Sequence, residues 1–158
     1  ESHFNMKHTK DIRFVLTGTV DRRIPDLGRY VKERSEGWDK DRLGNLFDGD
    51  LSRDSKSGGQ REGDLWATFD FGKAREIAGV QVYGDDKGGT GGMTVEIADG
   101  DEWKPIATHA RCYGDLLHEI RLEEPVTTDR LRLTLHGLPR NSYNWIREFW
   151  VLEPVPAK

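Results

Sequence analysis

The stretch LWATFDFGKAREIAGVQVYGDD, residues 65–86, decides the fold class of this 158-residue chain. Apolar side chains occupy every second position at its start: Leu65, Ala67, Phe69 and Phe71. Successive side chains of a strand point to opposite faces, so this spacing places the four apolar groups on one face. The opposite face is polar. The stretch therefore predicts half-buried antiparallel strands, with a turn at residues 70–73.

The same alternation recurs through the rest of the chain. It is found at Ala78–Val82, Met93–Ile97, Ile120–Leu122 and Leu131–Leu135, and a dense apolar run follows at Ile146–Leu152. Clusters of Gly, Pro and Asx residues separate these segments, at 85–92, 98–101, 123–125 and 138–141. Short strands joined by such turns indicate a β-sandwich or a barrel.

The segment upstream of residue 43 is less regular. Ile12, Phe14 and Leu16 suggest an early strand, whereas residues 21–42 are charge-rich with isolated apolar residues. We expect residues 21–42 to form an irregular wrap, a short strand or a helical turn.

We divide the chain into three parts. Residues 1–10 are expected to be a disordered or vector-derived head, residues 11–153 a single domain, and residues 154–158 a linker. The head contains no apolar core of a signal peptide, and the chain opens with Glu1. We therefore expect an excised segment of a longer protein.

Charge and cysteine content exclude several classes of function. The 24 Lys and Arg against 28 Asp and Glu give a net charge of −4, which disfavours binding to nucleic acid or to an anionic membrane. Cys112 is the only cysteine, so neither an intramolecular disulfide nor a cysteine metal cluster can form. A lone cysteine is more often a small buried apolar residue than a nucleophile.

The sequence contains no motif of a known catalytic class. GxSxG, HExxH, a P-loop and a dinucleotide-binding GxGxxG are missing, and the five histidines show no metal-ligand spacing. A pair of carboxylates that meet only in the folded chain stays open as an alternative, because acid–base pairs need no sequence spacing. We expect the domain not to be an enzyme.

The segment NLFDGDLSR, residues 45–53, has the composition of an acidic turn. Gly49 allows a sharp reversal, and Asp48 and Asp50 flank it. Such a turn can direct carboxylate and carbonyl oxygens at one point, as Ca²⁺ requires. It lacks the EF-hand spacing, and its local pattern fits an Asx turn equally well.

Five motifs follow one another in a recognisable order. They are Asp48-Gly49-Asp50, Trp66 to Gly72, Asp99-Gly100 with Trp103, Asp129 to Leu133, and Ile146 to Val151. Together they resemble the discoidin domain, also called the coagulation factor V/VIII C-type (F5/8 type C) domain. The similarity is greatest to the bacterial versions grouped with the family 32 carbohydrate-binding modules, and it covers residues 43–153.

This resemblance implies an all-β fold, an antiparallel jelly-roll β-sandwich of the galactose-binding-domain type. It would have about eight strands, preceded here by the irregular N-terminal segment. The resemblance also implies a calcium ion, usually structural, between the acidic turn and the last strand. Carried over by position, its ligands are Asp48, Asp50 and Glu148. Relatives often place a Thr hydroxyl where this chain has Arg53, whose side chain cannot coordinate a cation.

A sugar site needs an exposed aromatic ring that stacks on the C–H face of a pyranose, with polar groups beside it for the hydroxyls. Tyr143 lies in the loop where relatives commonly place that ring. The candidates in loops are Tyr143, with Arg140, Asn141 and Asn144 beside it, then Trp38, Tyr113 and Asp86. For each aromatic residue the alternative is a ring packed on the core.

The resemblance implies a non-catalytic carbohydrate-binding module that targets a larger secreted glycan-active enzyme to its polysaccharide or glycoconjugate substrate. Its partners would be an oligo- or polysaccharide and the catalytic domain of the parent chain, in a secreted or cell-surface location. The loops at 55–64 and 84–92 carry no apolar tips, so we expect no membrane binding. The alternative is a structural or protein-interaction β-sandwich that binds no free sugar.

Overall fold

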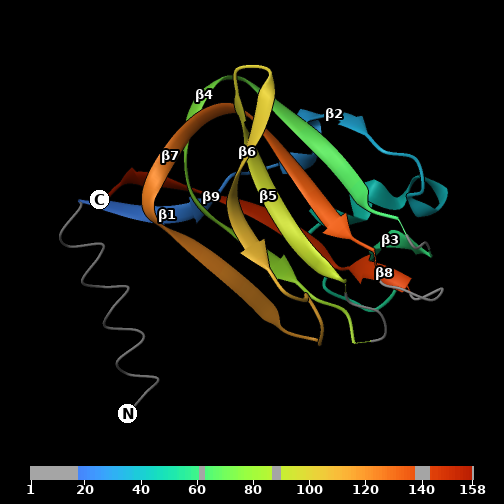
Figure 1. Cartoon of the computed structure of the whole chain (residues 1–158). Helices are drawn as coiled ribbons and strands as arrows, with labels where there is room; N and C mark the ends of the chain where they lie inside the picture. Colours follow the sequence, from blue (N-terminus) through green and yellow to red (C-terminus); the bar gives the residue numbers. More distant parts are fainter. Residues whose placement is uncertain (1–17, 61–62, 87–89, 138–142, 158) are drawn as a thin grey trace, which may run out of the picture.

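The computed structural model describes residues 18–60, 63–86, 90–137 and 143–157. Over these ranges the chain forms nine strands and two 3-10 helices (Figure 1). In chain order they are β1 (Thr19–Arg23), η1 (Leu27–Tyr30), β2 (Val31–Arg34), η2 (Asp39–Phe47), β3 (Ser57–Gln60), β4 (Leu65–Tyr83), β5 (Gly92–Asp99), β6 (Glu102–His109), β7 (Leu117–His136), β8 (Tyr143–Ile146) and β9 (Glu148–Pro156). Within these ranges, no helix has the length and apolarity needed to span a membrane.

Two long bent strands turn one sheet into a sandwich. The large antiparallel sheet has the order β1-β9-β4-β7-β5-β6, with β2 also paired to β4, and β3 and β8 form a small second sheet. The first part of β4, 65–70, pairs with 130–135 of β7, and its second part, 75–83, pairs with 117–128. β2 and β5 join the first pair, whereas β9 joins the second. The two halves therefore form the two layers of an all-β jelly-roll sandwich (Figure 1).

The predicted turn at 70–73 is a break in register within β4 instead of a connection between two strands. Gly72 adopts φ +72°, and its N–H donates to Asp70 Oδ1 at 2.8 Å. Residues 71–74 of β4 stand opposite the single residue Asp129 of β7, and such a surplus in one strand bends it and increases its twist, which carries the chain from one layer to the other. The predicted turn at 123–125 likewise lies inside the continuous strand β7.

The core lies between the layers and follows the predicted alternation. The four residues predicted to share the apolar face of 65–71 are each at most 5% exposed. Phe69, from the first layer, and Phe149, from the second, have ring centroids 6.0 Å apart. Phe47 of η2 stands edge-on to Phe69 at 5.8 Å. The 3-10 helix η2 therefore closes one end of the core.

The two ends of the described chain pair with each other. β1 runs antiparallel to β9, with Thr19 opposite Pro156, and the N–H of Ala157 donates to the carbonyl of Gly18. Residues 154–156, predicted as linker, therefore belong to the sheet. The irregular segment 21–42 consists of short strands and 3-10 turns. The predicted head and the predicted strand at Ile12–Leu16 lie outside the described residues.

Candidate functional site

The acidic turn after η2 is an Asx turn. Gly49 adopts φ +74°, a left-handed conformation that favours glycine. The N–H of Asp50 donates to Asp48 Oδ1 at 2.9 Å, and the N–H of Ser52 donates to Asp50 Oδ1 at 2.8 Å. The Asp50 carboxylate therefore supports the backbone of the turn.

Glu148, at the start of β9, meets this turn with a buried carboxyl group. Its Oε1 accepts a hydrogen bond from the N–H of Gly49 at 3.0 Å, and its Oε2 has no hydrogen-bond partner among the described residues. Burial, followed by the nearby carboxylate of Asp48, raises the pKa of Glu148 to about 9. Burial opposes ionisation of Asp48 as well, but the neighbouring carboxyl group of Glu148 and the hydroxyl of Ser55 outweigh it and lower the pKa of Asp48. Glu148 therefore holds the proton of the pair at neutral pH.

This pair fits a hard cation in part. A buried carboxylate oxygen that lacks a donor and lies beside a second carboxylate is stabilised by a proton or a cation. Asp48 and Glu148 can supply two oxygens of that kind. The Asp50 side chain is directed to its own turn, and within the described ranges no three His, Cys, Asp or Glu side chains gather as a metal site. Further ligands would have to be backbone carbonyls or water.

Arg147 ties the loops at this end of the sandwich together. Its side chain is 3% exposed, and its Nε donates to Asp85 Oδ1 at 3.0 Å. Its two terminal nitrogens donate to Asp86 Oδ1 at 3.0 Å and to Asp115 Oδ1 at 2.9 Å, and one also reaches the carbonyl of Leu51. Burial lowers the pKa of Arg147, but the three carboxylates outweigh this effect and raise it. The guanidinium fork therefore fixes three loops that are far apart in the sequence.

An aromatic ring is exposed beside this network. Tyr113 is 51% exposed, and the guanidinium carbon of Arg111 lies 5.3 Å from its ring centroid. Asp115 accepts a hydrogen bond from the hydroxyl of Tyr83 at 2.6 Å. Asp86 accepts one from Arg53 at 2.7 Å.

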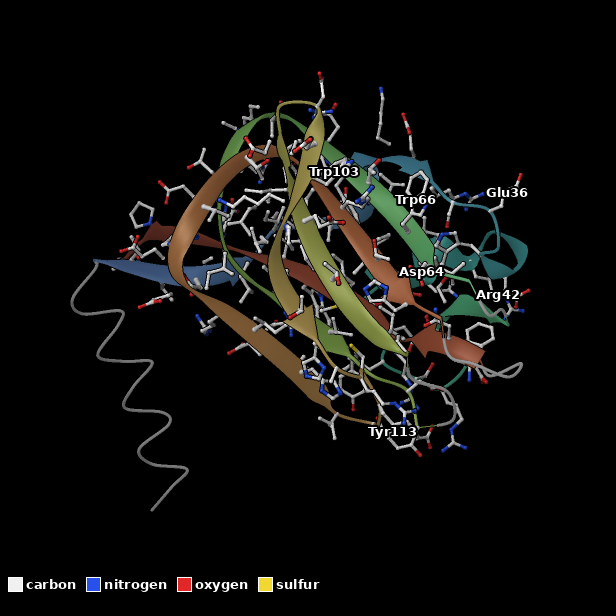
Figure 2. The ribbon with its side chains drawn as sticks, viewed as in Figure 1. Glu36, Arg42, Asp64, Trp66, Trp103 and Tyr113 are labelled. Atoms are coloured by element: carbon white, nitrogen blue, oxygen red, sulfur yellow. The ribbon has the colours of Figure 1, made fainter. Side chains whose placement is uncertain are left out.

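We call these five loop residues the Tyr113 rim: Arg53, Asp86, Arg111, Tyr113 and Asp115. The rim combines an aromatic ring with positively charged hydrogen-bond donors and negatively charged acceptors. Figure 2 shows Tyr113 at the lower edge of the molecule. Such a combination can bind a polyhydroxylated ring.

A second polar cluster joins β5, β7 and the residue before β4. Thr94 Oγ1 lies 2.7 Å from His136 Nε2, and His136 Nδ1 lies 3.2 Å from Asp64 Oδ2. Asp64 Oδ1 also accepts from the N–H of Gly137. This hydroxyl–imidazole–carboxylate series fixes the orientation of the histidine ring. Sequence reasoning missed it because its members are 72 and 42 residues apart, and their spacing carries no signal.

The remaining predicted sugar-site residues are divided between the interior and the part of the chain that is not described. Trp38 is 9% exposed, and its Nε1 donates to the carbonyl of Trp66 at 3.2 Å. Asn144 is fully buried, and its Nδ2 donates to the carbonyl of Leu135. Both residues thus belong to the core, so neither offers the exposed ring or amide that a sugar would contact.

Tyr143 and its neighbours cannot be placed in the same way. Arg140 and Asn141 lie outside the described residues, as does the side chain of Tyr143. Only the backbone of Tyr143 is described, and it pairs with Gln60 of β3. Of the predicted sugar-binding residues, the structure brings together Tyr113 and Asp86.

The chain matches one family model and several solved structures. The model of the F5/8 type C domain matches residues 30–149, more than half of the chain. No curated protein sequence matches it. The family 32 carbohydrate-binding module of NanJ from C. perfringens, solved in complex with galactose, is similar with a TM-score of 0.66 at 13% identity, covering 85% of this chain and 100% of that one.

Two other solved structures are larger than this chain. A truncated AlyQ with CBM32 and alginate lyase domains has a TM-score of 0.65 at 20% identity, covering 86% of this chain and 34% of that one. Allantoicase from Saccharomyces cerevisiae has a TM-score of 0.63 at 14% identity, covering 78% of this chain and 39% of that one. The chain thus spans little more than a third of either protein. At these identities the similarity shows the fold alone.

Proposed function

The chain belongs to the F5/8 type C domain family, and we propose that it is a non-catalytic carbohydrate-binding module. The observation that carries this proposal is the half-exposed ring of Tyr113, held on a rim of donors and acceptors. An aromatic face contacts the C–H groups of a pyranose, while Arg111 and Asp115 can bind its hydroxyls. The similar modules solved with galactose and with 4,5-unsaturated mannuronic acid support a pyranose ring as the ligand class.

The buried Arg147 network anchors part of the rim. Arg147 donates hydrogen bonds to Asp86 and Asp115, and the backbone of Tyr113 bridges to Asp85, a fully buried carboxylate on the same arginine. A preformed site loses little conformational entropy on binding, which matters for the weak contact of one sugar ring.

A module of this kind acts by raising the local concentration of a linked catalytic domain at the surface of its substrate. Linked to a catalytic domain, a weak sugar contact keeps that domain close to its polymer. AlyQ, which carries both CBM32 and alginate lyase domains, supports such a partner in a parent chain. We therefore propose a secreted or cell-surface glycan-active enzyme as the parent protein.

Calcium is the proposed cofactor, with a structural role. Asp48 and Glu148 would hold it, and the ion would replace the proton of the buried Glu148 carboxyl group, whose Oε2 has no hydrogen-bond partner among the described residues. The Asx turn and Ser55, whose hydroxyl donates to Asp48 Oδ2 at 2.5 Å, orient the Asp48 carboxylate for this role.

Binding of the purified domain to a panel of polysaccharides in affinity gels tests the proposal. Tyr113→Ala should weaken binding about tenfold, the value of one aromatic contact, without lowering the melting temperature. Tyr113→Phe keeps the ring and should bind as the wild type does. Binding that is equal in all three proteins would remove Tyr113 from the site.

The second candidate function is a protein-interaction domain, favoured by exposed apolar residues beside the rim. Leu51, Leu116 and Leu117 are 41–51% exposed. The carbonyl of Leu51 and the carboxylate of Asp115, the neighbour of Leu116, bind the same terminal nitrogen of Arg147. Failure to bind any polysaccharide in the panel would favour this reading, with the patch as the interface.

A further inference from the structure

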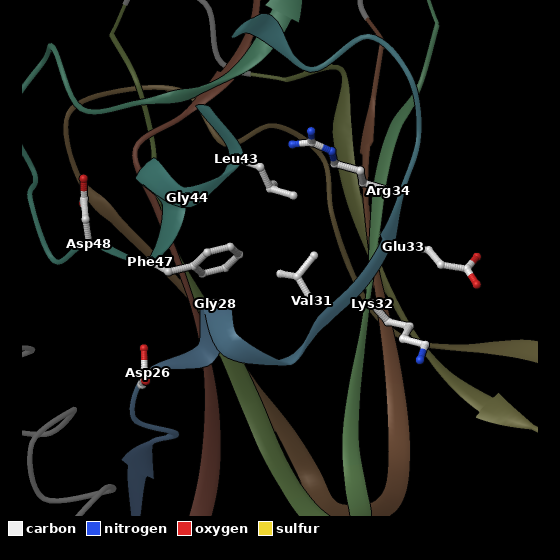
Figure 3. Close-up of a pocket in the computed structure, with 10 residues that line it drawn as sticks. All are labelled: Asp26, Gly28, Val31, Lys32, Glu33, Arg34, Leu43, Gly44, Phe47 and Asp48. Carbon is white, nitrogen blue, oxygen red and sulfur yellow. The ribbon is translucent and has the colours of Figure 1, made fainter. Parts of the chain in front are cut away.

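A pocket of about 520 Å³ lies on the flank of the sandwich, between η1, β2 and η2 (Figure 3). Its volume falls within the range of small-ligand sites. None of its lining residues belongs to the Tyr113 rim.

The pocket has an apolar floor with an aromatic ring. Val31, Leu43 and Phe47 converge in its centre (Figure 3). The Phe47 ring stands edge-on to the ring of Phe69, at an interplanar angle of 90°. A Cβ at Gly28 would lie 3.0 Å from the Phe47 ring, so a glycine at this position leaves room for the ring.

Charged groups border this floor on two sides. Asp26 and Asp48 lie apart from each other at one side, and Arg34 lines the other, whereas the side chains of Lys32 and Glu33 are directed away from the centre (Figure 3). Asp26 is the one described non-glycine residue with positive φ, at φ 54° and ψ 48°, and its side chain does not cap η1. Aspartate tolerates this left-handed conformation better than most residues, and its carboxylate is not used to cap the helix.

This combination of groups narrows the class of ligand. A purely apolar ligand would remove water from Asp26 and Asp48 without replacing their hydrogen bonds. A phosphate would be repelled by the two carboxylates, and a cation would face Arg34. A neutral polyhydroxylated ring meets every requirement, because its C–H face covers Phe47 while its hydroxyls donate to carboxylates and accept from a guanidinium.

We propose that this pocket is a second carbohydrate-binding site, specific for a neutral pyranose. It extends the proposed function, but it does not depend on the Tyr113 rim, since each site has its own ring and its own polar groups. Asp48 belongs both to the pocket and to the pair with Glu148, so a sugar bound here contacts the proposed calcium turn.

Titration of the ¹⁵N-labelled domain with galactose, glucose and galacturonate, followed by amide chemical shifts, tests this proposal. The neutral sugars should shift the amides of residues 26–34 and 43–48. Gly44→Leu should abolish these shifts by filling the pocket, because Gly44 lines it and a Cβ there meets no atom within 4 Å; an unchanged melting temperature checks that the variant is folded. Asp26→Asn should weaken binding about tenfold, as expected for a lost charge-assisted hydrogen bond.

Glu33→Gln is the matched control, because Glu33 also lines the pocket but its carboxylate points away from the centre (Figure 3). It should bind as the wild type does. Tyr113→Ala separates the two sites: the pocket shifts should persist in this variant even if the rim binds nothing. Pocket shifts that survive Gly44→Leu, no shifts at all, or stronger shifts with galacturonate than with galactose would each overturn the proposal.

Discussion

In calcium-free buffer the domain should lose stability as the pH rises, and Glu148→Gln should remove that loss. Burial and the neighbouring Asp48 raise the pKa of Glu148 from its ordinary 4.5 to about 9 in the folded chain. Between these values the folded state keeps a proton that the unfolded chain has released. The contribution is therefore complete below the unfolded pKa and is lost as the pH rises through the folded pKa.

The size of the pH effect on the free energy of unfolding follows from this difference of one bound proton between the folded and unfolded states. The free energy of unfolding should fall by about 1.4 kcal/mol for each pH unit, or about 3 kcal/mol between pH 5.5 and 7.5. Urea unfolding followed by tryptophan fluorescence, in EDTA at three pH values, measures the slope. Burial, then the charge of His109, lowers the pKa of His118 from its ordinary 6.5, so that histidine makes the domain less stable as the pH falls below this value. Because this trend opposes that of Glu148, the wild type must be compared with Glu148→Gln.

Equal slopes for the wild type and Glu148→Gln would refute the protonated state of Glu148, because Glu148 would then be ionised in the folded state.

The same measurements in the presence of calcium test the metal proposal. A cation that replaces the proton should flatten the slope of the wild type and raise its stability most at pH 7.5, with no effect on Glu148→Gln. A wild-type slope that is unchanged by calcium would refute the metal proposal and leave the protonated pair intact.

Three further outcomes are expected. Arg147→Met should cost about 3 kcal/mol in urea unfolding, since it removes the guanidinium that pairs with the buried Asp85 at 3.0 Å, whereas Lys56 lies 3.6 Å from the same carboxylate. A cost below about 1 kcal/mol would contradict a buried ion network. The Cys112 thiol, whose pKa burial raises to about 11, should react with a disulfide reagent at pH 8 far more slowly in the native protein than in urea, and equal rates would show that it is accessible. Deleting residues 154–158 should lower the melting temperature because 154–156 pair with β1, whereas a true linker would leave it unchanged.

Periodicity predicted the strands of this fold but not their continuity. The alternation of Leu65 to Phe71 fixed which side chains are buried, because only one face of such a strand can meet the core. The cluster around Gly72 was interpreted as a turn, and it is a bend within one strand. A glycine with a left-handed φ serves in either structure, so local sequence does not distinguish a hairpin from a bulge.

The sequence predicted some residues of the candidate site, but not most of the contacts between them. The acidic turn at Asp48 had a local signal, and its meeting with Glu148 followed from the family resemblance. Trp38 was proposed as an exposed ring, yet it is buried because its indole N–H finds a carbonyl partner inside the fold. Arg147 carried a signal that went unused: an arginine within a dense apolar run has to be buried and paired.

The sequence by itself determined the fold class, because burying one face of each strand needs only a period of two residues, which any short segment reveals. It also excluded an intramolecular disulfide, because that depends only on the count of cysteines. Only the tertiary structure decided which polar groups meet. The Arg147 network, the Tyr113 rim and the flanking pocket each join loops or strands that are distant along the chain. Their chemistry depends on distances of a few ångströms, and these are set by how the two layers close on each other.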